Sequence, residues 1–393
     1  MTLQTSVPNP LNAHIAQAIV EAGGWLPFDA FMALALFEPR WGYYAHGSGK
    51  LGRMPNADGH LGQPGQSGDA DPAHRATPPR QVATSDFVTA PEMTVVFGQT
   101  LALQIREALV QTQTDEIWEF GAGSGALAEQ LLHALRASGT QVARYTIVDI
   151  SGSLRARQQE RLCAFAGQVR WVSELPEQLR GVVVGNEVLD AMPVQLLARL
   201  NGQWFERGVV RALRGELAWG DRPTLLRPPF EVEGSHDYVT EIHPQAEAFI
   251  RTVAQRLTQG AAYFIDYGFP EREFYHPQRH MGTVMCHRAH RADADPLADV
   301  GHKDITAHVN FTGVALAGQD AGLNVLGYTS QGRFLLNCGL LAVMQTASLA
   351  DRIHAQKLVM EHEMGELFKV IGFCKGEAWS TLGFAQGDRT HTL

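Results

Sequence analysis

The sequence predicts an α/β fold: a Rossmann-like sheet of mostly parallel strands with helices on both faces. Short apolar runs alternate with amphipathic segments between residues 94 and 267, which is the pattern of strands joined by helices. The run that begins at Glu116 ends in a glycine-rich turn and leads into an Ala/Leu-rich helix, and the next run ends near Asp149. A glycine turn and a spaced acid after neighbouring strands indicate a site for a nucleotide-like ligand.

Two short amphipathic helices are expected near the start of the chain, over residues 11–22 and 27–37, with two glycines between them. Residues 46–80 are rich in Gly, Pro, Asp, Ser and His and have almost no apolar periodicity, so we expect a long loop there. A helix over 94–111 then leads to the first strand of the sheet.

The alternating part of the chain supplies the remaining elements. Predicted strands cover residues 116–121, 145–150, 169–173, 181–186 and 261–267, and predicted helices cover 125–138, 152–166, 188–192 and 244–259. Strand-like pieces between 194 and 240 predict an antiparallel insertion between the fourth and fifth parallel strands. After a polar section over 270–308, we expect a helix (310–321), a strand (323–329) and helical segments over 332–346 and 350–374.

Three parts of the chain follow from this pattern. Residues 1–85 hold the N-terminal helices and the long Gly/Pro-rich loop, residues 86–330 form the Rossmann-like domain with its insertion, and residues 331–393 form C-terminal helices. Apolar surface on these last helices would suit a homodimer.

The composition is that of a globular protein without a nucleic-acid partner. The 393 residues are 45% hydrophobic and 19% charged, and the net charge is −9, whereas non-specific nucleic-acid binders are usually basic. The four cysteines are far apart, which favours free thiols in a reducing compartment. The first residues do not resemble a signal or transit peptide, and no run of eighteen apolar residues is present. We therefore expect a cytoplasmic protein that is not inserted in a membrane.

The glycine turn has the spacing Gly121-Ala-Gly123-Ser-Gly125 after Glu119 on the strand. A dinucleotide site has the spacing G-x-G-x-x-G and directs a helix N-terminus at a pyrophosphate, which a nearby acid would repel. The observed form looks more like the first motif of S-adenosylmethionine (SAM) methyltransferases, because a carboxylate suits the cationic amino end of SAM. The alternatives are a nicotinamide dehydrogenase and a turn with a purely structural role.

We expect a cofactor site made of the glycine turn and the polar residues around it. Its predicted members are Glu119, Gly121, Ala122, Gly123, Ser124, Gly125, Asp149, Ser151, Asn186, Thr89 and Glu92. Thr89 and Glu92 would face the methionine part of SAM or the substrate. Alternatively, Thr89 caps a helix that has Pro91 in its first turn.

Polar residues also follow the fourth and fifth strands. Asn186, Glu187 and Asp190 come directly after four apolar strand residues, and Asp266 ends the fifth strand, so all four should lie at the same edge of the sheet. The alternatives are that Asp190 caps the next helix, that Glu187 is solvated, and that Asp266 only binds backbone amides of a loop.

A metal site is not expected. His287, His290 and His302 lie near Cys286 in the sequence, but their spacing provides no second pair of ligands, so we expect structural or substrate-facing polar residues.

Taken together, the motifs resemble the MidA family of class I SAM methyltransferases. The resemblance spans roughly residues 10–375. It rests on Gly42-Tyr-Tyr, Asp86-Phe-Val-Thr-Ala-Pro-Glu, the glycine turn, Asn186-Glu-Val-Leu-Asp-Ala-Met-Pro, Asp266-Tyr-Gly, Asp304-Ile-Thr-Ala-His-Val-Asn-Phe and Gly332-Arg-Phe-Leu-Leu-Asn-Cys-Gly. The chain departs from the family at Asp149, where glutamate is usual, at Asn310, where aspartate is usual, and in its longer loop over 46–80.

The resemblance implies SAM as cofactor and N-methylation of an arginine in a protein substrate, since mitochondrial members methylate a subunit of respiratory complex I. A guanidinium group stays protonated at neutral pH, and carboxylates can hold it through paired hydrogen bonds. Glu187 is the first candidate for this clamp, followed by Asp190 and Asp266. A methyltransferase acting on a small molecule, or an assembly protein that keeps the fold without turnover, remain alternatives.

Overall fold

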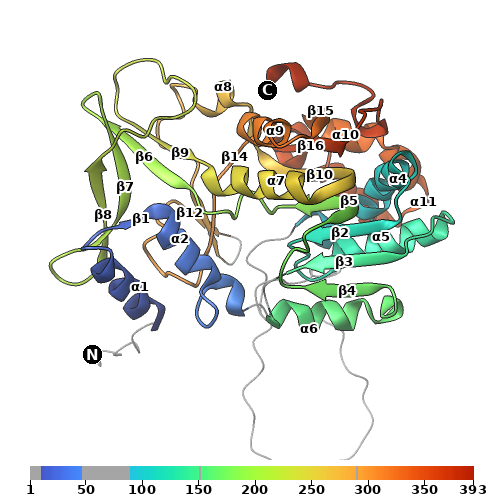
Figure 1. The fold of residues 1–393 in the computed structure, drawn as a ribbon, viewed down its shortest axis with the longest axis horizontal. Coiled ribbons are helices and arrows are strands. Elements are labelled where there is room, and N and C mark those ends of the chain that lie inside the picture. Colours follow the sequence, from blue (N-terminus) through green and yellow to red (C-terminus); the bar gives the residue numbers. More distant parts are fainter. Residues whose placement is uncertain (1–9, 47–88, 150–151, 289–290) are drawn as a thin grey trace, which may run out of the picture.

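The computed structural model describes residues 10–46, 89–149, 152–288 and 291–393. Predictions for residues 47–88, for Ser151 and for His290 lie outside these ranges. An eight-stranded sheet forms the centre of the molecule, with the order β15-β16-β10-β5-β2-β3-β4 and with β14 paired to the end of β10 (Figure 1). Its strands are β2 (Glu116–Phe120), β3 (Arg144–Val148), β4 (Val169–Val172), β5 (Leu179–Asn186), β10 (Leu257–Phe269), β14 (Val309–Asn310), β15 (Asn324–Ser330) and β16 (Phe368–Lys375). This confirms the predicted Rossmann-like α/β fold.

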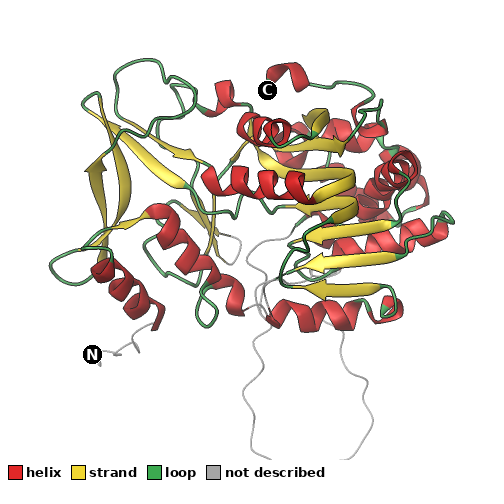
Figure 2. Ribbon diagram, viewed as in Figure 1, coloured by secondary structure: helices red, strands yellow, loops and turns green. Residues whose placement is uncertain are grey.

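The sheet is buried on both faces, which explains why its strands are nearly continuous apolar runs. Along β5, Val182 and Val184 pack into one core while Val183 packs into the other. Helices α4, α5 and α10 to α12 cover the first face, and α7 and α9 cover the second (Figures 1 and 2). These helices are α4 (Val95–Thr112), α5 (Ala126–Ala137), α7 (Pro244–Arg256), α9 (Phe311–Asp320), α10 (Gln331–Asn337), α11 (Leu340–Thr346) and α12 (Leu349–Lys357).

Shorter helical pieces complete this part of the molecule. They are α3 (Ala90–Met93), α6 (Gly152–Arg161), the 3-10 helices η2 (Cys163–Phe165), η4 (Leu382–Phe384) and η5 (Thr390–Thr392), and the π-helical turn η3 (Glu361–Gly365). Within the described ranges, no helix is long and apolar enough to cross a membrane.

The predicted helix over 350–374 is wrong beyond α12. Residues Phe368–Lys375 form β16, which lies antiparallel between β10 and β15. The run contains aromatic and β-branched residues that fit a pleated, doubly buried surface, and tertiary pairing decides between strand and helix for such a short run.

The predicted helix over 188–192 is also wrong, because these residues form a turn after β5. The Asp266 carboxylate accepts the backbone N–H groups of Val188, Leu189 and Asp190, at 3.1, 2.9 and 3.2 Å. Pro193 follows and has no N–H to continue a helix.

A second unit lies beside the central sheet and includes the predicted antiparallel insertion. The insertion is confirmed by β6 (Gln195–Leu200), β7 (Gln203–Arg211), β8 (Leu217–Pro223) and β9 (Tyr238–Ile242), which pair with β1 (Leu26–Pro27) in one antiparallel sheet. Helices α1 (Pro10–Glu21) and α2 (Phe28–Phe37), followed by the 3-10 helix η1 (Tyr43–His46), pack on it through a shared apolar core (Figure 1).

The section over 270–308 also carries structure that its polar composition did not reveal. It contains α8 (Glu271–Phe274) and a three-stranded sheet of β11 (Met285–Arg288), β12 (Arg291–Asp293) and β13 (Asp304–Thr306). Cys286 on β11 and Ile305 on β13 are buried in the same core as α1 and α2. The N-terminal helices, the insertion and this small sheet therefore form one apolar unit.

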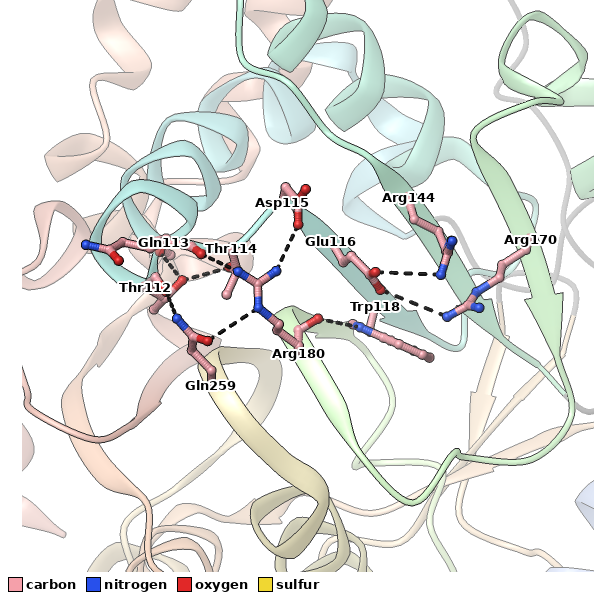
Figure 3. A network of polar contacts seen from close by, with 11 residues as sticks. Thr112, Gln113, Thr114, Asp115, Glu116, Trp118, Arg144, Arg170, Arg180 and Gln259 are labelled. Atoms are coloured by element: carbon pink, nitrogen blue, oxygen red, sulfur yellow. Dashed lines mark hydrogen bonds and ion pairs between the residues drawn. The ribbon is translucent and has the colours of Figure 1, made fainter.

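Paired charges connect the strands at their amino ends. The Arg180 guanidinium bonds the Asp115 carboxylate at 3.0 Å, and Glu116 pairs with Arg144 at 3.6 Å and with Arg170 at 4.0 Å (Figure 3). Arg170 also lies over the Trp118 ring, 5.0 Å from its centroid. At this edge of the sheet, each acid faces a guanidinium group.

Candidate active site

The opposite, carboxyl edge of the sheet carries a cavity of about 470 Å³. This volume is within the range of small-molecule sites. Glycine-loop residues, Asp149 at the end of β3 and the turn after β5 line one side of the cavity, while η1, β11 and β13 of the second unit line the other. Of the predicted site residues in the described ranges, only Gly125 and Asp266 do not line it.

The glycine loop follows β2 with a left-handed backbone. Gly121, Gly123 and Gly125 have φ angles of 62°, 53° and 84°, which glycine adopts without steric cost. A Cβ atom at Gly121 would lie 3.0 Å from the Val188 side chain. Gly125 begins α5 behind the cavity. The loop therefore exposes backbone to the cavity where side chains would fill it.

Asp149 lies beside this loop and is held there by Gln158 of α6. The Gln158 amide donates to Asp149 Oδ2 at 2.8 Å and to the Gly123 carbonyl at 2.9 Å. Its side-chain oxygen accepts the Trp171 indole N–H at 2.9 Å, and Gln158 is fully buried. This bridge fixes the distance between the loop and the carboxylate, although nothing in the sequence pattern singled out Gln158.

Glu119 is buried at the end of β2 and accepts the Tyr145 hydroxyl at 2.8 Å. Burial, the largest cause, raises the pKa of Glu119 to about 8; the Tyr145 hydrogen bond opposes the shift and the Asp149 charge adds to it.

Thr89 and Glu92 line the cavity from the start of α3. The Thr89 side chain caps no N–H of this helix, so the capping alternative fails. Glu92 Oε1 accepts hydrogen bonds from the Ser124 hydroxyl and, at 3.1 Å, from Arg161. Glu92 thus fixes α3 to the glycine loop, and its charge is paired.

The turn after β5 presents three polar side chains to the cavity. Glu187 has a left-handed φ of 53°, unusual for a residue other than glycine, and accepts the Asn186 amide at 2.9 Å. Asn186 Oδ1 and Asp190 Oδ1 are both buried without a hydrogen-bond partner among the described residues. Buried polar atoms of this kind normally have a partner, so each is suited to a ligand.

Asp266 has a different position. It is 1% exposed, and its Oδ1 accepts the Tyr267 N–H at 3.0 Å while its Oδ2 holds the three amides of the turn after β5. This arrangement agrees with the alternative in which Asp266 binds backbone amides of a loop. Its carboxylate holds the turn that presents Glu187 and Asp190 to the cavity.

A family model for S-adenosyl-L-methionine-dependent methyltransferases, Methyltransf_28, matches residues 100–329 of the chain. The chain belongs to this family. It is also similar to a solved COG1565 superfamily member from Burkholderia thailandensis bound to S-adenosyl-homocysteine, with 45% identity, a TM-score of 0.88 and full coverage of both chains. A second structure from the same organism has 43% identity and a TM-score of 0.85, again over both full chains. The resemblance to MidA-type methyltransferases is thereby confirmed.

Among curated proteins, the methyltransferase is similar to mitochondrial enzymes. A protein arginine methyltransferase NDUFAF7 homolog of Caenorhabditis elegans is 23% identical over 339 residues, covering 76% of this chain and 75% of that protein. Human protein arginine methyltransferase NDUFAF7 is 25% identical over 336 residues, or 72% of each chain.

The cavity of the methyltransferase fits SAM, its cofactor. The glycine loop provides a backbone cradle, Asp149 provides an acceptor suited to a ribose diol, and the unpartnered Asn186 Oδ1 can accept an N–H group. Glu119 and Asn186 would hold the cationic amino-acid end and Asp149 the ribose.

The remaining lining residues of the methyltransferase concentrate negative charge. Burial, followed by the Asp190 charge, raises the pKa of Glu187 to about 8, and burial raises the pKa of Asp190 to about 6. No lysine or arginine lines the cavity within the part of the chain that the structure describes.

Four residues without a predicted role also line the cavity: Tyr44, Tyr267, Asp304 and Thr306. Their only sequence signals were the motifs Gly42-Tyr-Tyr, Asp266-Tyr-Gly and Asp304-Ile-Thr, which supported the family resemblance and not a site. His287, predicted to be a structural or substrate-facing residue, lines the cavity as well.

Proposed function

We propose that the enzyme transfers the methyl group of SAM to a guanidinium nitrogen of an arginine in a protein substrate. The observation that carries this proposal is the charge of the cavity: Glu187, Asp190 and Asp304 lie beyond the glycine loop, with no lysine or arginine among the described lining residues. Buried carboxylates that repel one another are stabilised by a cation. The similarity to relatives named protein arginine methyltransferases supports arginine as the source of that cation.

When bound, SAM supplies a methyl group activated by its sulfonium sulfur. The residues of the enzyme then have to hold one guanidinium nitrogen in line with that methyl group, which is a positioning task. Asp190 can accept N–H bonds from the two other nitrogens and Glu187 an N–H of the reacting nitrogen, so the planar group has one orientation. The Asp266 carboxylate, which fixes the turn carrying both residues, acts on the orientation of the clamp and not on the substrate.

The methylated nitrogen must release one proton, because a methylguanidinium group still carries a single positive charge. Glu187 is suited to accept it, since its pKa of about 8 in the free protein is close to the working pH. Approach of a guanidinium group favours the ionised form of Glu187, which is then ready as a base. Asp190, with a lower pKa of about 6, provides the constant negative charge.

The test is methyl transfer from isotope-labelled SAM into the proteins of a cell lysate, followed by hydrolysis and identification of the labelled amino acid. We expect label in methylarginine with the unchanged enzyme and no label with Glu187→Gln. The matched control is Asp115→Asn, which removes a carboxylate at the opposite edge of the sheet and should keep full activity.

Label in another amino acid would overturn the arginine substrate. No protein label, together with a clear rise in melting temperature on adding S-adenosyl-homocysteine, would overturn the protein substrate and favour a small molecule or a role in assembly. The cytoplasmic location and the homodimer stay predictions.

A further inference from the structure

The far wall of the cavity comes from the second unit. Tyr44 lies on η1 and Asp304 begins β13, and their side chains meet although 260 residues separate them in sequence. His287 on β11 is the cross-strand partner of Asp304, and all three residues line the cavity. The unit that packs against the central sheet therefore contributes part of the site.

Tyr44 is held in one position by aromatic neighbours. Its ring stacks on Phe37 with centroids 5.4 Å apart and planes at 19°, and the edge of Tyr43 contacts it at 5.1 Å. From this position the Tyr44 hydroxyl donates to Asp304 Oδ1 at 3.0 Å. Burial, followed by the charges of Asp304 and Asp190, raises the pKa of Tyr44, so the hydroxyl remains a donor at neutral pH.

The Asp190 charge also acts on the Tyr44 hydroxyl. The Asp190 carbonyl accepts the Ala307 N–H at 3.0 Å, which connects the end of β13 to the turn after β5. Asp190 is 5% exposed; its carboxylate has a hydrogen bond with the Tyr267 side chain, while its Oδ1 has no partner among the described residues. A tyrosine hydroxyl has one proton to donate, and here it is directed at Asp304. The buried oxygen of Asp190 is left for a donor that comes with a ligand.

We propose that Asp304 is a specificity-determining residue that binds the substrate guanidinium together with Asp190, and that Tyr44 positions it. This inference rests on the proposed function. A guanidinium group has five N–H donors in one plane, so it can bond two carboxylates at once, whereas a lysine ammonium has three donors at one point. The second unit thus selects the substrate, and the Rossmann sheet holds the methyl donor.

The experiment uses the full-length enzyme with labelled SAM and increasing amounts of lysate protein, with methylarginine as the readout. Asp304→Asn should raise the half-saturating concentration of lysate protein about tenfold or more, which corresponds to losing one charge-assisted hydrogen bond. Tyr44→Phe should raise it less, about threefold, because the carboxylate remains. The affinity for S-adenosyl-homocysteine, measured by calorimetry, should not change in either variant.

The double variant distinguishes a positioning role from a structural one. If Tyr44 acts through Asp304, then adding Tyr44→Phe to Asp304→Asn should have no further effect. The control is Asp299→Asn, which removes a carboxylate from the same segment, where it pairs with Arg288 outside the cavity.

Each outcome decides one claim. If the unchanged enzyme labels no methylarginine, the proposed function fails and this inference fails with it. If it does label methylarginine and Asp304→Asn saturates like the control, this inference alone is overturned. The same holds if the two single effects simply add, because Tyr44 then does not act through Asp304. If Asp304→Asn does not fold, as judged by the loss of S-adenosyl-homocysteine binding, then unchanged saturation in Tyr44→Phe overturns the positioning role.

Discussion

Replacement of Glu187 by glutamine should stabilise the free enzyme while it abolishes methyl transfer. The pKa of Glu187 is raised from 4.5 to about 8, first by burial and then by the Asp190 charge. Between these two values the folded protein keeps a proton that the unfolded chain releases. The free energy of unfolding therefore falls as the pH rises from about 4.5 to about 8. Glutamine does not ionise, so the Glu187→Gln variant does not lose this part of the free energy of unfolding.

The size of the effect follows from the pKa difference. At pH 7.5 the unfolded chain gains up to about 4 kcal/mol from ionising this group, at about 1.4 kcal/mol per pH unit above its own pKa. Part of the Glu187 side chain stays in contact with solvent, so we expect about 1–2 kcal/mol after discounting for screening. The advantage of Glu187→Gln over the unchanged enzyme should be small at pH 5 and largest near pH 8.

Urea unfolding at pH 5, 6, 7 and 8 measures this difference. The control is Glu177→Gln, which removes an exposed glutamate outside the cavity. If the difference in the free energy of unfolding between Glu187→Gln and the unchanged enzyme does not depend on pH, the raised pKa of Glu187 is refuted. Retained methyl transfer would refute its role in the clamp and as base, even if the stability gain is observed.

Three further changes test the geometry of the cofactor site and of the turn that carries the clamp. Asp149→Ala should weaken S-adenosyl-homocysteine binding about tenfold to a hundredfold by calorimetry, because a charged acceptor is lost, and unchanged affinity would exclude Asp149 as the ribose acceptor. Gln158→Leu should weaken the same binding about threefold to tenfold, since Asp149 loses its fixed donor, and an effect larger than that of Asp149→Ala would contradict this mechanism. Asp266→Ala should lower the free energy of unfolding by about 2–4 kcal/mol in urea titrations, because one partly buried and two buried amides lose their acceptor; a small loss of stability together with a complete loss of turnover would instead assign Asp266 to the substrate.

The cofactor side of the cavity could be predicted because its sequence pattern is local. The glycine turn indicates left-handed backbone angles, which are found at Gly121, Gly123 and Gly125. The position of Asp149 is predicted by the length of one strand–helix–strand unit. Neither prediction requires knowledge of distant contacts. The same is true of the insertion, whose strands are joined by short turns along the chain.

The elements that were mispredicted depend on partners far away in sequence. Residues 188–192 have an acceptable helical pattern, but the carboxylate that holds their amides as a turn belongs to Asp266, on the next parallel strand. The apolar run of β16 fits a helix or a strand equally well until β10 and β15 are placed on either side of it. The hydrogen bond between Tyr44 and Asp304 cannot be predicted from the local sequence pattern, because it depends on how the second unit packs.

The two edges of the central sheet explain where the substrate charge belongs. At the amino edge, Arg180 pairs with Asp115 and two arginines pair with Glu116, so both of these acids have a cationic partner (Figure 3). At the carboxyl edge, burial raises the pKa values of Glu187 and Asp190, and the Asp190 charge raises that of Glu187 further. An isolated buried acid lowers stability, and such a cluster persists when a function requires it. Within the part of the chain that the structure describes, no lysine or arginine lines the cavity at this edge, so a planar cation with several donors is the ligand expected from a substrate.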